Sequence, residues 1–469
     1  MAFFVPINFG MAQLSIQIRI TFAKNIRMKI LRAYLLTTLF LLLGLIGNSA
    51  FAQRNINDIL DSTTVNNLLI ISKKYGSVSF GGYLQPQFQY AQAKGAPAEY
   101  QGGNFGDFTD NRFRLRRGRL RADYSLLNAD GTPSTYFVFQ FDGTEQGVNV
   151  RDFWGRYYEH HFQLFYFTAG LAGRPFGSEL QLSSSSRESP ERGRMSQILM
   201  KTERDLGVMF TFNPRKKDAK LKNIQFDLGI YNGQGLSGPQ EFDNSKDFVL
   251  RLSHKNYAFK KFPVNVSGGV SALLGGLNHQ LPIKYQMQRV NNNWAMVKDS
   301  ATSNLNQIAP RKYYGADIQF STQKKSWKSE LRAEYITGLQ TGSSTTSNTP
   351  GTIPTDKNAV KLPYYTRNFD GAYFTFVQTL NSTDNQLIFK YDWYDPNLKV
   401  KGEEITAAKG LSGADVRFDT FGFGFMHHFN PHLKAVVYYD MIKNEKTKLN
   451  NYQNDLDDNV LTIRTQFYF

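Results

Sequence analysis

The sequence predicts an all-β protein: a transmembrane antiparallel β-barrel of about 16 strands, with short periplasmic turns and long extracellular loops. Three observations predict this fold. Apolar and polar residues alternate along most segments after residue 75, the connections alternate between short and long, and the last strand ends in Phe469. Alternation with period 2 is typical of a strand whose two faces meet different surroundings.

The composition agrees with a β protein and excludes several other classes. The 469 residues include 38 Phe, 25 Tyr and 38 Gly, and aromatic residues are enriched in strands. A mean hydropathy of −0.42 excludes a bundle of membrane helices for most of the chain. The absence of Cys excludes disulfide frameworks, thiol catalysis and cysteine-based zinc sites.

The N-terminus resembles an export signal. Lys29 and Arg32 precede the apolar run 33–46, and Ala50-Phe51-Ala52 supplies an A-x-A cleavage site. We therefore predict a signal peptide over 1–52, in which 1–27 is an extension from the gene model that precedes the true start. A short periplasmic segment (53–74) and the barrel (75–469) follow.

Removal of the predicted signal peptide leaves a protein with more basic than acidic residues. Five of the 55 Lys and Arg residues lie in 1–52, so 50 basic residues face 39 acidic ones, a net charge of +11. Such an excess favours nucleic acid, anionic lipid head groups or an anionic solute as partner. Export excludes nucleic acid and leaves lipid, including lipopolysaccharide, and small anions.

Sixteen strands can be marked. They are 77–90, 111–126, 134–143, 148–159, 161–172, 204–213, 221–231, 245–254, 262–273, 311–322, 326–338, 370–380, 384–394, 414–427, 431–443 and 459–469. Every second connection is short, and the others are long except 144–147. An even number of strands with loops sorted by length is typical of bacterial outer-membrane barrels. The barrel must close because an open sheet edge in hydrocarbon leaves backbone groups unpaired.

The second strand carries the most informative residues, FRLRRGRLR at 113–121. Its lipid-facing set is Leu120, Ala122 and Tyr124, and its lumen-facing set is Arg117, Arg119, Arg121 and Asp123. An Arg facing lipid at mid-depth costs roughly 2–4 kcal/mol, so the arginines must face water. Phe113 and Leu115 have the opposite parity. Either a β-bulge near Arg116-Arg117-Gly118 shifts the register, or Arg112, Arg114 and Arg116 lie near the head groups.

Arginines along a pore wall are the usual device for attracting anions. Their planar guanidiniums suit phosphate or carboxylate. An alternative stays open: the arginines pair with lumen carboxylates such as Asp123, Asp142 and Asp227, which gives a weakly selective polar pore.

The connection 173–203 is longer than a turn requires, and such loops are usually functional or disordered. Folded inward, it would narrow the pore and contribute charge there. Its candidate anion-binding residues, with the first residue of the next strand, are Arg174, Arg187, Arg192, Arg194, Lys201 and Arg204. The alternative is an exposed surface loop.

Six blocks resemble, in order, the phosphate-selective porin O and P family. They are DNRFRLRRGRLRADYSLL (110–127), STYFVFQFDG (134–143), VRDFWGRYY (150–158), AGRPFGSELQLSSSS (172–186), ERDLGVMF (203–210) and YNGQG with DNSKDFVLRLS (231–253). The resemblance implies a sixteen-stranded, often trimeric porin whose third loop enters the lumen and whose basic residues draw phosphate. The terminal Phe469 resembles the signal that the barrel-assembly machinery reads. The middle of the loop departs from the family pattern, so constriction roles for Arg187, Arg192 and Arg194 rest on the residues alone.

The resemblance and the residues together predict a passive diffusion channel that prefers anions. Two other functions stay open: a saccharide channel lined by Tyr136, Tyr158 or Tyr231, and a barrel whose long loops act as an adhesin. No nucleophile elbow, phosphate-binding loop or metal-ligand spacing is present. The sequence therefore predicts no enzyme, no catalytic residue, no metal site and no cofactor.

Overall fold

The computed structural model describes residues 77–469 except 202, 238–240, 260–262, 325–326 and 381–383. The predicted signal peptide (1–52) and the segment 53–74 lie outside these residues. The barrel strands are β1 (Ser77–Ala91), β2 (Asn111–Leu127), β3 (Pro133–Thr144), β4 (Gly147–Tyr158), β5 (Phe165–Gly173), β6 (Arg204–Phe212), β7 (Ile224–Tyr231), β8 (Asp247–Ala258), β9 (Val264–Asn278), β12 (Ile308–Lys324), β13 (Trp327–Gly342), β14 (Tyr364–Thr379), β15 (Asn385–Asp395), β16 (Phe418–Asn430), β17 (Leu433–Asn444) and β18 (Val460–Tyr468).

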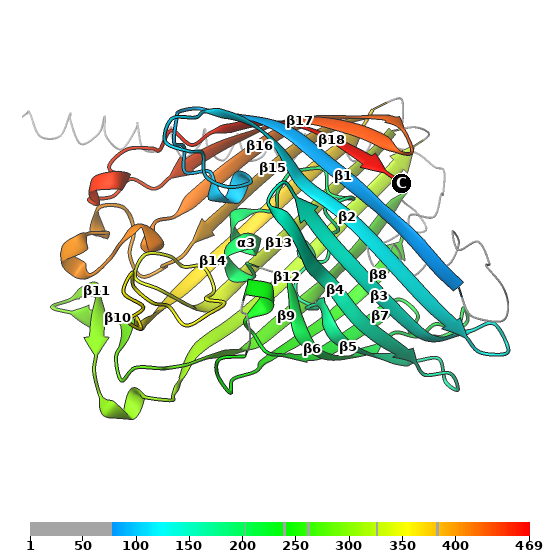
Figure 1. The fold of residues 1–469 in the computed structure, drawn as a ribbon, viewed down its shortest axis with the longest axis horizontal. Helices are drawn as coiled ribbons and strands as arrows, with labels where there is room; N and C mark the ends of the chain where they lie inside the picture. The colour runs from blue at the N-terminus through cyan, green and yellow to red at the C-terminus, as the bar shows by residue number, and fades with distance from the viewer. Residues whose placement is uncertain (1–76, 202, 238–240, 260–262, 325–326, 381–383) are drawn as a thin grey trace, which may run out of the picture.

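These sixteen strands form one closed antiparallel barrel, as predicted. Each strand pairs with the next along the chain, and β9 pairs directly with β12. The first and last strands close the ring, with Leu84 opposite Phe467 and Ala91 opposite Val460. The backbone of Phe469 continues this ladder by exchanging hydrogen bonds with Gly82. Figure 1 shows the long connections at one end of the barrel and the short turns at the other, beside the C-terminus.

The remaining two strands form a hairpin inside the predicted loop 274–310. They are β10 (Lys284–Val290) and β11 (Asn293–Asp299), and β10 also pairs in parallel with the start of β14. The sequence analysis missed this hairpin. Its turn residues Asn291 and Asn292 have positive φ (48° and 64°), the conformation that tight hairpin turns require and that Asn tolerates.

Helices are few and short. Helix α3 (Arg194–Leu199) lies within the connection 174–203. The 3-10 helices are η1 (Glu99–Gln101), η2 (Gly235–Ser237), η3 (Thr302–Asn304), η4 (Gly402–Glu404), η5 (Ala407–Lys409), η6 (Gly413–Asp415) and η7 (Asn450–Tyr452). Among the described residues, no helix combines the length and the apolar character needed to cross a membrane.

Several predicted strand boundaries differ from the structure by four to six residues, as at the start of β14 (Tyr364 against the predicted 370), and at β5 a local turn explains the difference. β5 begins at Phe165, whereas the sequence placed a strand over 161–172. The carboxylate of Glu159 accepts hydrogen bonds from the backbone N–H groups of Phe162 (2.5 Å) and Leu164 (3.2 Å). These bonds hold 159–164 as a turn and delay the start of the strand.

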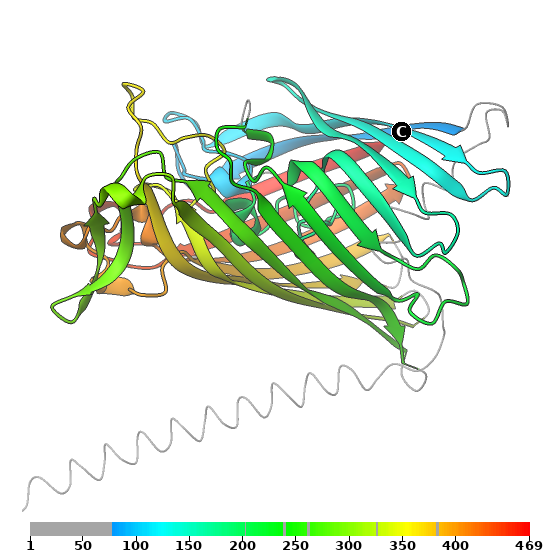
Figure 2. The same ribbon diagram turned by 90° about the horizontal axis from the view of Figure 1, so that it is seen from below.

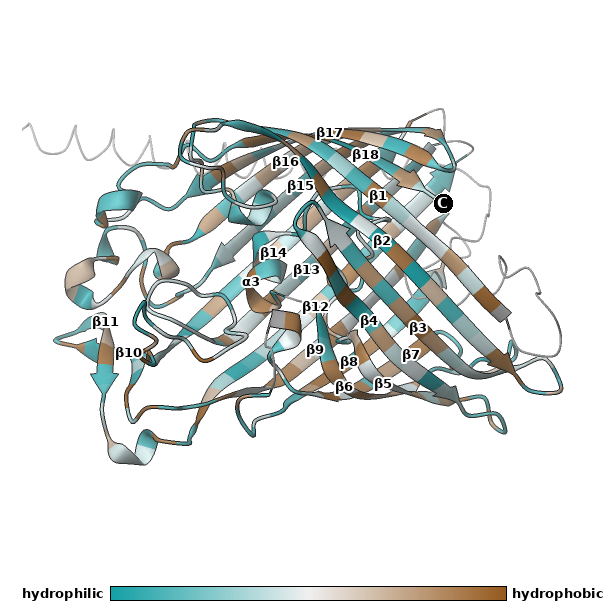
Figure 3. Cartoon of the chain, viewed as in Figure 1, coloured by the Kyte–Doolittle hydropathy of each residue, from teal (hydrophilic) through white to brown (hydrophobic). Residues whose placement is uncertain are grey.

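The barrel has apolar residues outside and charged residues inside. Leu120, Phe374 and Phe423 are 42–49% exposed, whereas Arg311, Arg367 and Asp247 are at most 1% exposed. Figure 3 shows the resulting alternation of hydrophobic and hydrophilic residues along the strands. In β1, Phe80 and Leu84 face outward and Gln85 and Gln87 face inward, as the period-2 pattern predicts.

Candidate functional site in the barrel lumen

The arginines of β2 face the lumen, and a β-bulge allows them all to do so. Gln85 of β1 pairs with Arg117 and Pro86 pairs with Leu115, so Arg116 is left without a partner in the ladder. This bulge confirms the first of the two alternatives raised by the sequence. Arg112 donates to the inward-facing Gln89 (3.1 Å), so its side chain also points into the barrel.

The lumen-facing arginines of β2 have carboxylate partners. Arg119 lies 3.2 Å from Asp142, and Arg121 lies 2.6 Å from Asp123. Asp123 also accepts a hydrogen bond from the hydroxyl of Tyr136 (2.6 Å). Ion pairing between wall arginines and wall carboxylates, which the sequence left open, is therefore present for two of the three predicted arginines.

The connection 174–203 folds into the barrel, and we call its described residues the inner loop. Figure 1 labels α3 within the outline of the barrel, and Figure 2 shows the same barrel from below. Its apolar side chains pack against inward-facing side chains of the wall. The cluster comprises Phe176, Leu180, Met195, Ile198, Leu199 and Met200 of the loop with Tyr231, Val249, Leu273, Tyr313, Ile336, Phe369, Tyr373 and Tyr394 of the wall. The alternative of an exposed surface loop was wrong.

Buried ion pairs tie the polar side of the inner loop to the wall. The carboxylate of Glu179 lies 2.5 Å from the Lys390 ammonium, and Glu188 lies 2.5 Å from Arg332. Burial raises the pKa of Glu179, but Lys390 and hydrogen bonds from Ser196 and Gly193 outweigh it and lower this pKa to about 2. Glu179 is therefore ionised at neutral pH.

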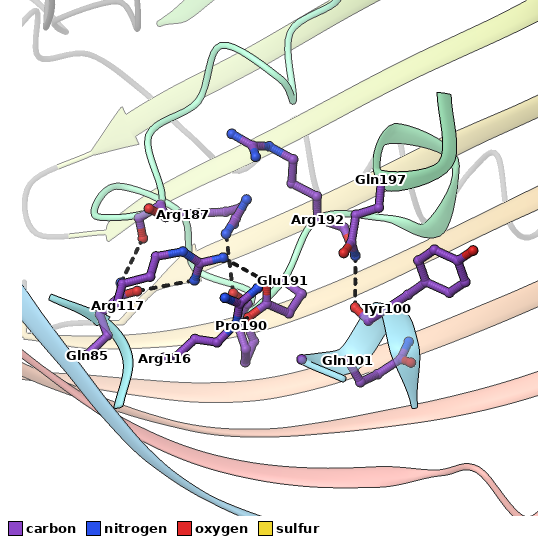
Figure 4. A network of polar contacts seen from close by, with 12 residues as sticks. Gln85, Tyr100, Gln101, Arg116, Arg117, Arg187, Pro190, Glu191, Arg192 and Gln197 are labelled. Carbon is purple, nitrogen blue, oxygen red and sulfur yellow. Dashed lines mark hydrogen bonds and ion pairs between the residues drawn. The ribbon is translucent and has the colours of Figure 1, made fainter. Parts of the chain in front are cut away.

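At the tip of the inner loop, Glu191 binds three arginines. It lies 2.9 Å from Arg116, 2.9 Å from Arg117 and 2.7 Å from Arg464. Burial raises the pKa of Glu191, but the three guanidiniums hold it well below its usual range. Figure 4 shows Arg116, Arg117 and Arg187 gathered around Glu191 and Pro190.

The predicted residues near the two ends of the loop lie among acidic side chains. Arg174 approaches Asp205 (3.7 Å) and Asp247 (3.8 Å). Arg204 binds Asp152 (3.0 Å). Lys201 is exposed, and no ion pair of it is seen within the described residues.

The three predicted arginines in the middle of the loop are separated. Arg192 binds Glu203 (3.0 Å) and donates to three backbone carbonyls of the loop. The side chain of Arg187, a residue of the loop itself, is buried. Arg194 lies between two rings, 4.5 Å from the centroid of Tyr100 and 3.7 Å from that of Phe418. The middle of the loop therefore does not form one ring of constriction charges.

A cavity of about 470 Å³ lies between the inner loop and the wall formed by β1 to β7. Its lining holds six arginines and four carboxylates. The arginines are Arg119, Arg121, Arg156, Arg174, Arg192 and Arg204, and the carboxylates are Asp123, Asp152, Glu203 and Asp227. The lining side chains therefore carry a formal charge of +2, while Asp142, Asp205 and Asp247, which pair with Arg119 and Arg174, lie outside the lining. An excess of positive charge favours anions in the enclosed water.

A second cavity, of about 190 Å³, lies on the side of the long loops. Arg194 lines it together with Tyr100, Tyr394, Phe418 and Tyr452. The inner loop thus separates a small aromatic cavity from the larger arginine-rich cavity. No group of three or more His, Asp or Glu side chains suited to a metal ion occurs in the described part of the chain.

Several lumen residues were missed by the sequence analysis. Arg156 stacks on Tyr166 (4.2 Å) and donates to Thr168 (3.0 Å), and Lys434 and Arg464 contact the inner loop. Their parity could have identified them, because each shares a strand face with other polar residues. The role of Glu191 has no such signal, since it depends on how the loop folds.

No family model and no curated protein sequence matches the chain. Many solved structures are similar in fold, among them the following two. The outer membrane channel DcaP of Acinetobacter baumannii is 12% identical over 85% of this chain and 99% of that chain, with a TM-score of 0.50. OprB of Pseudomonas putida, in its high-pH structure, is 10% identical over 90% of this chain and 100% of that chain, with a TM-score of 0.51.

These similarities establish the fold, a sixteen-stranded outer-membrane barrel. The closed ring of strands and its apolar exterior satisfy what a bilayer demands of a spanning β-sheet. The protein is located in the bacterial outer membrane.

Proposed function

We propose that the protein is an outer-membrane porin: a passive diffusion channel for small hydrophilic solutes that prefers anions such as phosphate. The observation that carries the proposal is the 470 Å³ cavity beside the inner loop, whose lining holds six arginines against four carboxylates. A wet lumen with excess guanidiniums raises the local concentration of anions and lowers that of cations.

The candidate residues take two roles in this proposal. Arg119, Arg121, Arg174, Arg192 and Arg204 line the cavity and supply the field that attracts anions. Arg117 holds the inner loop through Glu191 and acts on permeation through the loop. Arg187, Arg194 and Lys201 lie outside the cavity lining, so we assign them no contact with a solute there.

The remaining expectations belong to the same proposal. The signal peptide (1–52) directs export, and Phe469 at the closing strand is read by the barrel-assembly machinery. A homotrimer and phosphate as the favoured anion follow from the resemblance of the sequence blocks to the phosphate-selective porin family. The outer surface contacts lipid and lipopolysaccharide.

A weakly selective pore is the second candidate, and the ion pairs of Arg119 and Arg121 favour it. The electric fields of paired opposite charges cancel at a distance. The anion selectivity of the pore then depends only on the arginines in excess of the carboxylates. A saccharide channel is a third candidate, because Tyr136 and Tyr158 do face the lumen and are buried there. The adhesin alternative requires a barrel that does not conduct.

The test is the reversal potential of single channels across a KCl gradient. We expect chloride to permeate better than potassium, and we expect Arg156→Gln with Arg204→Gln to reduce this preference. The matched control is Lys446→Gln with Lys448→Gln, which also removes two charges, from exposed side chains of the loop after β17. A preference for potassium in the wild type contradicts anion selectivity, and absence of conductance contradicts a channel.

Competing solutes separate the remaining candidates. In the anion-selective case, phosphate added to one side reduces the chloride current and maltodextrin does not. Block by maltodextrin alone favours the saccharide channel. Equal insensitivity to both, with a small chloride preference, favours the weakly selective pore.

A further inference from the structure

The tip of the inner loop, residues 184–191, lies in a region with an excess of positive charge. The cations around it are Arg187 of the loop and Arg116, Arg117, Lys328, Arg332, Lys434 and Arg464 of the wall. The carboxylates are Glu188, Glu191 and Glu330. Seven cations therefore face three carboxylates in a part of the barrel that is largely closed to solvent.

The three carboxylates are occupied by other cations. Glu191 binds Arg116, Arg117 and Arg464 at once. Both oxygens of Glu188 accept from Arg332, at 2.5 and 2.9 Å. Glu330 is shared between Arg332 and Lys328. No carboxylate oxygen within the described residues lies in ion-pair distance of Arg187 or Lys434.

Arg187 is the most exceptional member of this group. It is 5% exposed, and its guanidinium has one hydrogen bond, from Nη2 to the carbonyl of Pro190 at 3.3 Å. Its Nε and Nη1 are buried without a partner among the described residues. Burial, together with the charge of the neighbouring Arg117, lowers the pKa of Arg187 to about 10. A buried charged donor without an acceptor is costly.

Lys434 approaches the same place from β17. It is 7% exposed, and its ammonium donates to the carbonyl of Ser185 at 2.7 Å. An ammonium has three donors, so this bond leaves capacity for another acceptor. A small cavity of about 10 Å³ is lined by Arg187, Lys434 and Arg464, with Ser189, Gln85 and Glu188 also on its wall.

The geometry points to a binding site for one monatomic anion of the halide class, held by Arg187 and Lys434 beneath the inner loop. The anion is a structural counter-ion: it accepts the unpartnered N–H groups and fixes the loop tip against β17 and β18. The cavity volume of about 10 Å³ limits the occupant to a single small particle and excludes a polyatomic oxyanion. The excess of cations around the cavity favours an anion as that occupant. The site lies outside the lining of the large cavity, so it is separate from the proposed path of diffusing solutes.

Anomalous diffraction from crystals of the full protein grown with sodium bromide tests the site directly. We expect one anomalous peak within contact distance of Arg187 Nε or Nη1 and Lys434 Nζ. The peak should vanish in Arg187→Gln and persist in Arg194→Gln, a matched variant in the same loop whose guanidinium lies between two rings. No bromide at this position in the wild type, or a peak that persists in Arg187→Gln, overturns the proposal.

Thermal unfolding gives an independent readout that needs no crystal. The midpoint for the wild type should be higher in sodium chloride than in sodium gluconate at equal ionic strength, because an anion that binds only the folded state stabilises it. Arg187→Gln should lose this difference, and Arg194→Gln should keep it. An equal chloride effect in wild type and Arg187→Gln counts against the site.

The two proposals fail separately. A wild-type channel that prefers potassium contradicts the anion-selective porin and leaves the bromide peak untouched. Conversely, the absence of bromide at Arg187 contradicts the proposed anion site. It does not affect the proposed chloride preference of the channel, which the reversal potential tests.

Discussion

At the scale of single residues, Glu191 supplies the negative charge that three arginines at the loop tip share. Its carboxylate is the common counter-charge of three guanidiniums, and Arg117 and Arg464 are at most 8% exposed. Removing one partner of a buried ion pair destabilises strongly because it leaves an uncompensated charge in a region of low dielectric. The loop tip should therefore depend on this side chain more than on any single arginine around it.

We predict that Glu191→Gln lowers the free energy of unfolding by about 3–5 kcal/mol, since it leaves three buried or half-buried arginines without that negative charge. Equilibrium unfolding by urea in lipid vesicles measures the change. Glu145→Gln is the control, because Glu145 pairs with Arg114 while 40% exposed. Exposed pairs contribute below about 1 kcal/mol. Equal losses in the two variants would contradict a special role for Glu191.

The residue scale also shows what the sequence could reveal of the site. The inward direction of Arg117, Arg119 and Arg121 followed from parity and the cost of charge in lipid, and the structure confirms it. Their partners were only partly predictable. Asp123 and Asp142 lie on β2 and on the adjacent β3, so strand register identifies them. Glu191 reaches Arg464 from 273 residues away, and no local pattern encodes that contact.

At the scale of elements, the inner loop behaves as a small amphipathic plug. Phe176, Met195 and Ile198 pack on the aromatic side of the lumen, and Glu179 and Glu191 bind cations of the wall. The loop is held by both interactions, so it should stay in place when one ion pair is lost. Its apolar anchor stabilises this position because large apolar side chains are removed from water there.

We predict that Phe176→Ala loosens the inner loop and costs about 3–5 kcal/mol, the usual range for removing a fully buried Phe. Limited proteolysis of the protein in detergent should then cleave within 174–203, and the single-channel conductance should fluctuate more. Phe108→Ala is the control, since Phe108 is 89% exposed in the first long loop. A proteolysis pattern unchanged from wild type would show that the ion pairs suffice to hold the loop.

The elements differ in how far the sequence predicts them. Strands such as β2 and β8 were found because one face must be apolar against lipid, which imposes a strict period of 2. The β10–β11 hairpin lies outside the barrel ring, where lipid imposes no such pattern. Its apolar residues Met287, Trp294 and Met296 pack against loop residues that include Ile405 and Val416. The sequence alone does not reveal this packing, because the two segments are far apart along the chain. The turn residues Asn291 and Asn292 were the one local signal that could have revealed it.

At the scale of the whole molecule, the distribution of residues is inverted relative to a soluble protein. Side chains such as Phe374, Phe389 and Phe425 are 41–43% exposed on the outer wall, whereas Arg367 and Asp415 form a buried pair 2.7 Å apart inside. The exterior faces hydrocarbon, so its apolar side chains are stable there. The same surface in water would be a large apolar patch prone to association.

This inversion predicts a penalty that depends on depth. Phe374 lies five residues from the periplasmic end of β14, which a tilted strand places near the middle of the bilayer, whereas Phe429 lies at the periplasmic end of β16. We predict that Phe374→Arg costs about 2–4 kcal/mol beyond Phe374→Ala, and that Phe429→Arg costs at most about 1 kcal/mol beyond Phe429→Ala.

The alanine variants remove ring contacts such as that of Phe374 with Trp393, so they isolate the effect of the charge. Unfolding titrations in vesicles measure all four variants. Equal penalties at the two depths would mean that Phe374 does not face hydrocarbon, and the orientation of the barrel wall would have to be reversed, with the arginines of β2 turned toward lipid.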